Sequence, residues 1–223
     1  MIARLEPVDE RIPEKVRGIY SHLAGNVIET HGALDELMFL FGTSENVSVL
    51  NASAPAFFVR YERLPIDGII LSLSRMTDKK RSGSGKNSQE NLSLPGLLEL
   101  PDAKYQQLRT DLRKRWTEIK GTAKPLRTYR HKLLAHADLA QYVSASTRLG
   151  QNISIASIKK LLEQISDFLN AFDYFFTGVE TTYSRPASYG DANDLITYLN
   201  LAIETEKKTR NALLRAADEA STG

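Results

Sequence analysis

The stretch SIKKLLEQISDFLNAFDYFF at residues 157–176 decides the fold, because its apolar residues recur at intervals of three and four. Those residues are Ile158, Leu161, Leu162, Ile165, Phe168, Leu169, Phe172 and Phe175. This spacing places apolar side chains on one face of an α-helix, which has about 3.6 residues per turn. We therefore predict a helix over residues 157–176 whose apolar face is buried in a core of other helices.

The same periodicity predicts helices along most of the chain on either side of this stretch. They cover residues 12–41, ending before Gly42, 44–61 with a break at Pro55, 66–77, 102–121, 126–140 and 195–214. Residues 94–100 are a short apolar segment. We find no alternation of strands and helices, no strand pairs and no internal repeat. The prediction is an all-α helical bundle with a long C-terminal helix.

Length and composition are those of one ordinary globular domain spanning residues 1–223, with 42% apolar and 25% charged residues. The chain has no cysteine, which excludes disulfides, thiolate metal sites and cysteine nucleophiles, and four histidines make metal chemistry sparse. No apolar run reaches the roughly 20 residues of a membrane span, and the N-terminus has no signal-peptide pattern. We expect a cytoplasmic protein with no cofactor, no metal and no membrane association.

Positive charge is concentrated in two places, although the net charge is only +2. Residues 104–132 hold ten basic and two acidic side chains, and the mobile loop predicted at residues 78–93 holds four basic ones. A local positive potential favours polyanions such as RNA, and the alternative is a solvated helix face. The predicted RNA-binding residues are Arg113, Lys114, Arg115, Lys120, Lys124, Arg127, Lys79, Lys80 and Arg81.

Histidine carries the candidate chemistry, because the chain lacks phosphate-binding glycine loops and the common hydrolase motifs. The stretch RTYRHKLLAHAD at residues 127–138 contains Arg130, His131 and His136 at the end of the basic region. Metal-free cleavage of RNA needs a base for the 2'-hydroxyl, an acid for the leaving 5'-oxygen and a cation for the phosphate charge. An arginine beside a proton-transferring histidine meets these needs.

Arg130 and His136 do not point in one direction on a straight α-helix. Six residues at about 100° each place the two side chains roughly 120° apart. The helix is therefore broken between them, or two copies of the chain bring their motifs together across a two-fold axis.

The Arg130 to His136 spacing, with a polar residue directly after the arginine, resembles the signature of the HEPN superfamily. The chain is most similar to the AbiU-type abortive-infection branch, through RHKLLAHAD at residues 130–138, LSLSRMTD at residues 71–78 and the later NLSLPGLL. The resemblance implies a dimeric, metal-independent endoribonuclease in phage defence, or a toxin, with a possible cognate antitoxin or defence partner. It implies catalytic roles for Arg130 and His136, with His131 and Asp138 orienting them. Asp138 stands where some of these toxins carry a tyrosine that an antitoxin nucleotidylates.

Each site residue also has a purely structural interpretation. Arg130 can pair with a carboxylate such as Asp138 or Asp78, His136 can be a half-buried core histidine, and His131 can lie on the surface or at an interface. The corresponding alternative function is a non-catalytic helical module that binds RNA or docks a protein, or a subunit that regulates a separate enzyme.

Overall fold

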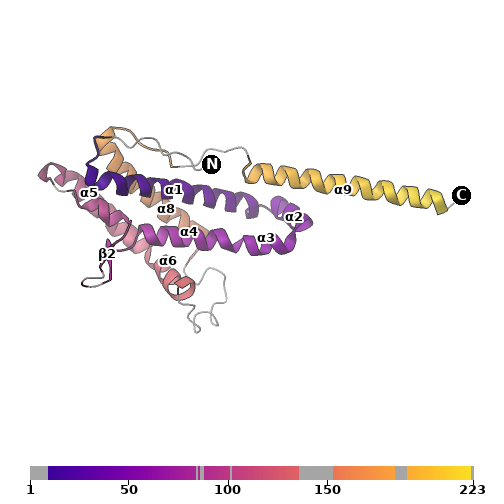
Figure 1. Cartoon of the computed structure of the whole chain (residues 1–223), viewed down its shortest axis with the longest axis horizontal. Coiled ribbons are helices and arrows are strands. Elements are labelled where there is room, and N and C mark those ends of the chain that lie inside the picture. The colour runs from indigo at the N-terminus through magenta and orange to yellow at the C-terminus, as the bar shows by residue number, and fades with distance from the viewer. Residues whose placement is uncertain are drawn as a thin grey trace. The chain divides into compact units, whose positions relative to one another are not determined.

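The protein is described here by a computed structural model covering residues 10–83, 85, 88–100, 102–135, 153–183 and 190–221. Helices dominate these residues, which confirms the all-α prediction (Figure 1). In chain order the elements are α1 (Glu14–Phe41), α2 (Ser44–Ser53), α3 (Pro55–Tyr61), α4 (Arg63–Met76), β1 (Arg81–Ser82), β2 (Gln89–Glu90), η2 (Leu94–Leu98), η3 (Ala103–Tyr105), α5 (Gln106–Thr122), α6 (Lys124–Tyr129), η4 (Arg130–Ala135), α8 (Ile155–Thr177) and α9 (Ala192–Ser221).

The elements group into two compact units. One consists of Met1–Gly32 and Asp67–Arg185, and the other of Ala33–Ile66 and Pro186–Gly223. Helices α1 and α4 each contribute one part to each unit. That residues 1–223 behave as one domain stays a prediction from the sequence.

Helix α8 is the centre of the first unit. Ser154 and Ser157 form a capping box at its start, because each side-chain oxygen accepts a hydrogen bond from the other residue's backbone N–H. Gly178 ends the helix with φ of 71°, a left-handed conformation that suits glycine. Between these ends one apolar face is buried, as the sequence pattern predicts, except that Phe175 is 45% exposed because it lines a cleft at the end of the helix. Its buried apolar residues are Ile158, Leu161, Leu162, Ile165, Phe168, Leu169 and Phe172.

Helices α5 and α1 contact α8, and α4 contacts α1. Helix α5 packs along α8. The first part of α1 packs on α8 through Tyr20, whose ring stacks on Phe172 with centroids 5.3 Å apart. Between α1 and α4, the hydroxyls of Thr30 and Ser72 lie 2.8 Å apart. The first unit is therefore a bundle whose core is shared by α1, α4, α5 and α8.

The segment predicted as an open loop at residues 78–93 contains a short antiparallel hairpin, which corrects the prediction of no strand pairs. Arg81 pairs in register with Glu90, and Ser82 with Gln89. The Arg81 guanidinium donates to the Glu90 carboxylate at 2.8 Å, and the Asn91 amide donates to the Lys79 carbonyl at 2.7 Å. Polar side-chain contacts thus hold a hairpin that has no apolar alternation to reveal it.

The second unit has its own small core. Leu40, Leu50, Phe58 and Ile196 are buried together. Thr43 caps the start of helix α2, because its hydroxyl accepts from the Asn46 N–H at 3.2 Å, and Pro55 separates α2 from α3 as predicted. Helix α2 packs against the first part of α9.

Candidate functional site

Arg130 forms a two-point ion pair with Asp78 in the first unit. Its Nη1 donates to Asp78 Oδ2 at 2.5 Å and its Nη2 to Oδ1 at 3.2 Å. The side chains are 24% and 28% exposed, so the pair is partly shielded from solvent and still accessible. Two N–H···O contacts fix both the position and the plane of the guanidinium. Of the two carboxylates proposed for Arg130 from the sequence, Asp78 is the one within the described residues.

Two neighbouring side chains fasten the same segment to helix α4. Arg127 donates from Nη1 to the carbonyl of Thr77 at 2.8 Å, just beyond the last turn of α4. Tyr129 is buried, and its hydroxyl donates to Asp67 Oδ1 at 3.3 Å. The cation of Arg127 also suits this end of α4, where the helix dipole is negative. Arg130 is therefore presented by a segment that is itself anchored.

Arg130 begins a π-helical turn, η4, that runs to Ala135. A π turn closes i to i+5 hydrogen bonds and is wider than an α-helical turn, so the rotation of about 100° per residue does not hold across it. Such turns are frequent at functional sites. The interruption considered from the sequence is therefore present after Arg130. His136 and Asp138 lie outside the described residues, and their placement stays a prediction. His131 is exposed on the π turn.

The predicted RNA-binding residues fall into two groups by their contacts. The first group is exposed, and no ion pair joins its members to any described residue: Arg113, Lys114, Lys120, Lys124 and Lys79. The second group is engaged within the protein: Arg115 with Asp111, Arg127 with Thr77, Lys80 with Glu99 and Glu90, and Arg81 with Glu90. The positive charge open to a ligand is therefore smaller than the sequence count indicates.

The ion pairs of the hairpin stabilise the charged forms of the side chains that make them. The hydrogen bond from Arg81 and the charge of Lys80 lower the pKa of Glu90, and the hydrogen bond to Glu99 raises the pKa of Lys80. At neutral pH these groups hold the hairpin and are not free phosphate ligands.

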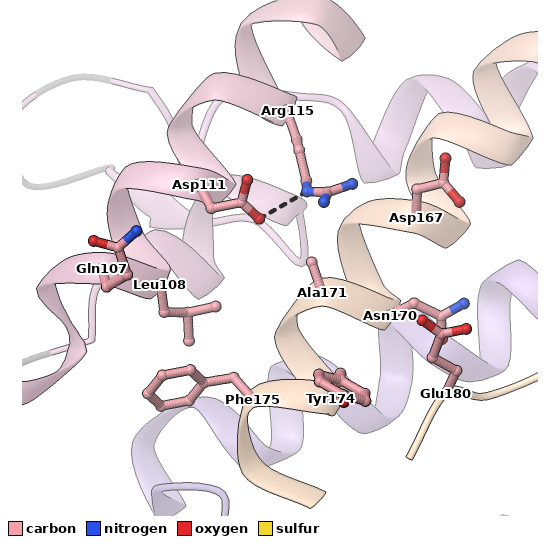
Figure 2. A pocket seen from close by; sticks show the side chains of 10 residues that line it. All are labelled: Gln107, Leu108, Asp111, Arg115, Asp167, Asn170, Ala171, Tyr174, Phe175 and Glu180. Carbon is pink, nitrogen blue, oxygen red and sulfur yellow. Dashed lines mark hydrogen bonds and ion pairs between the residues drawn. The ribbon is translucent and has the colours of Figure 1, made fainter. Parts of the chain in front are cut away.

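A cleft of about 410 Å³ lies between α5 and α8 (Figure 2). Figure 2 shows Asp111 joined to Arg115 on the α5 side, with Asp167 on the α8 side. Glu180 adds a third carboxylate to the lining, against the one guanidinium of Arg115. This excess of negative charge disfavours a phosphate backbone, so the cleft is distinct from the candidate ribonuclease site.

A buried polar cluster on α1 and α8 is not visible in the sequence. Thr181 donates to Asp173 Oδ2 at 2.9 Å, and Asp173 is buried. Burial, together with the negative charge of Asp173, raises the pKa of Tyr20 to about 12. Burial also raises the pKa of Tyr183. The cluster joins the segment after α8 to the core.

Two classes of site can be assessed within the described ranges. No group of three or more histidine, aspartate or glutamate side chains there is placed to hold a metal ion. None of the helices described combines the length and apolar character needed to span a bilayer.

The all-α bundle is the fold class expected of a HEPN-type protein. A family with the description AbiU2 (HEPN_AbiU2) matches residues 13–201, which is most of the 223-residue chain. The chain belongs to this family, and it is a HEPN-type abortive-infection protein. Comparison with curated proteins and with solved structures gives no match.

Proposed function

We propose that this protein is a metal-independent endoribonuclease that acts in phage defence or as a toxin, with a composite active site at a homodimer interface. The observation that carries the proposal is the anchored Arg130 at the end of a segment with exposed cations. Family membership agrees with a role in abortive infection.

Arg130 retains the capacity to bind a phosphate while it is paired with Asp78. A guanidinium has five N–H donors, and Asp78 accepts two of them, one from each Nη. The remaining three are directed elsewhere. The carboxylate also holds the guanidinium in one plane, which lowers the entropy lost when a phosphate binds. Asp78 is thus a positioning residue for Arg130 in this proposal.

The proposed reaction is attack of the 2'-oxygen on the adjacent phosphorus. The 2'-hydroxyl proton passes to a base, the bond from phosphorus to the 5'-oxygen breaks, and an acid protonates that oxygen. His136 serves as acid or base, and the guanidinium of Arg130 stabilises the charge growing on the non-bridging oxygens. The products are a 2',3'-cyclic phosphate and a free 5'-hydroxyl.

The test is cleavage of RNA by the purified full chain in excess EDTA. We expect products ending in a 2',3'-cyclic phosphate or its hydrolysis product. His136→Ala and Arg130→Ala should each lower the rate by about 10² to 10⁴. His22→Ala is the matched control, because His22 is an exposed histidine of α1 outside the site.

Two results would overturn parts of the proposal. Cleavage that requires Mg²⁺ refutes the metal-free mechanism. If no RNA is cut, even with extract of infected cells as a source of the trigger, and His136→Ala is silent in a phage-protection assay, the protein is a docking module instead.

A further inference from the structure

The second half of α9 is exposed, and none of the residues that the structure describes covers it. Every residue from 204 to 220 is exposed, and Leu213 and Leu214 are 67% and 56% exposed. Figure 1 shows α9 running on past α2, the helix that packs on its first part. An isolated helix of this length is only marginally stable in water, because helical stability comes mostly from packing an amphipathic face.

This part of α9 has two different faces. At about 100° per residue, one face carries mostly small and apolar residues, and the opposite face is charged. The apolar face includes Ala202, Thr209, Leu213, Ala216, Ala217 and Ala220. The charged face includes Glu204, Lys208, Arg215 and Asp218. A shallow groove runs along the apolar face past Leu201, Thr205 and Leu213.

The apolar face contains two charged residues of opposite sign, Glu206 and Arg210, both of which line the groove. They are four residues apart, and neither forms an ion pair with any residue that the structure describes. A partner for this face must therefore supply a cation opposite Glu206 and an anion opposite Arg210. A second copy of α9 in antiparallel orientation does so.

We propose that α9 pairs with α9 of a second copy of this chain, antiparallel, about a two-fold axis at position 208. A two-fold axis at residue 208 brings each residue level with the partner residue whose number adds with its own to 416. Glu206 therefore lies opposite the partner's Arg210, and Arg210 lies opposite the partner's Glu206. A parallel, in-register pair instead places like charges opposite each other. The interface is isologous, as a closed dimer requires.

The charges provide a reversal and rescue experiment, measured by light scattering and sedimentation of the full chain. Arg210→Glu places four carboxylates in the interface, and dimerisation should weaken about tenfold or more. Glu206→Arg should weaken it similarly. The double variant Glu206→Arg with Arg210→Glu restores opposite charges and should restore the dimer. Lys208→Glu makes the same charge change on the opposite face and is the matched control.

Orientation is tested by single cysteines, which are unambiguous because the chain has none. Measured along the helix axis, antiparallel pairing brings the two copies of residue 209 within about 3 Å of each other. It separates the two copies of residue 217 by about 27 Å. Thr209→Cys should therefore form a disulfide dimer and Ala217→Cys should not. Cross-linking of both variants, or of neither, overturns the proposal.

This inference does not rest on ribonuclease activity, and the experiments separate the two. A dimer that is insensitive to Arg210→Glu overturns α9 pairing and leaves the homodimer of the proposed ribonuclease intact. A monomer at micromolar concentration overturns both. Loss of RNA cleavage in Arg130→Ala with normal α9 pairing affects neither dimer proposal.

Discussion

The ion pair between Arg130 and Asp78 allows a quantitative prediction for Asp78→Asn. The substitution keeps the shape of the side chain, removes its charge and turns one of the two acceptor oxygens into an amide donor. That donor then opposes an N–H of Arg130. Asp78 lies just after the C-terminal end of α4, where a negative charge is unfavourable without a compensating cation.

The magnitude follows from the geometry and the exposure. Hydrogen bonds to charged groups contribute about 1.5 to 3 kcal/mol, and exposed ion pairs about 0.2 to 1 kcal/mol. Side-chain exposures of 24% and 28% place this pair between those cases, at about 1 to 2 kcal/mol. Removing the negative charge beside the C-terminal end of α4 stabilises the folded protein by about 0.3 to 1 kcal/mol, which offsets part of that loss. We expect Asp78→Asn to lower the free energy of unfolding by about 1 kcal/mol, which corresponds to a decrease of about 2 to 4 °C in Tm.

A double-mutant cycle isolates the pair. Unfolding in urea is measured for the wild type, Asp78→Asn, Arg130→Gln and the double variant, and the coupling energy should be about 1 to 2 kcal/mol. Asp102→Asn is the control, because Asp102 lies 3.6 Å from an exposed Lys104 and should change stability by less than about 0.5 kcal/mol. A coupling energy below about 0.3 kcal/mol would refute the anchoring of Arg130 by Asp78.

Two further predictions concern alkaline stability and RNA binding. Below pH 10 Tyr20 is neutral in the folded and unfolded states, but between pH 10 and about 12 only the unfolded state loses its proton, so stability falls as pH rises. In urea unfolding between about pH 9 and 11.5, Tyr20→Phe should therefore lose stability less steeply with pH than the wild type. The same loss in both proteins would contradict a raised pKa for Tyr20. Replacing Arg113 and Lys114 with Ala should reduce the slope of log affinity for single-stranded RNA against log salt by about 0.7 per lost contact. Equal slopes for the wild type and the variant would show that Arg113 and Lys114 do not contact RNA.

The helices could be predicted because their signal is local. Residues 12–41, 157–176 and 195–214 correspond to α1, α8 and α9, since apolar side chains at intervals of three and four must share a face. The observed α9 continues to Ser221, beyond the last apolar residue of the pattern. Its end is rich in alanine, lysine and arginine, which have high helix propensity and extend the helix past the apolar pattern.

The hairpin could not be predicted in the same way. Arg81 and Glu90 are nine residues apart in a stretch of polar and glycine residues, and neither strand alternates apolar with polar side chains. The pairing depends on side chains that meet only when the chain turns back on itself.

The sequence alone determined where most of the helices lie, which face of α8 is buried, and which region carries the arginine and histidine motif, because these follow from spacing along the chain. It left Arg130 with two acidic candidates and no means of choosing between them. Only the tertiary structure shows the ion pair with Asp78, which is 52 residues away in sequence. The pair depends on how α6 lies along α4, where Arg127 donates to Thr77 beyond the helix end and Tyr129 donates to Asp67 within the helix. Contacts of that kind depend on how several helices share one core, and no local pattern encodes them.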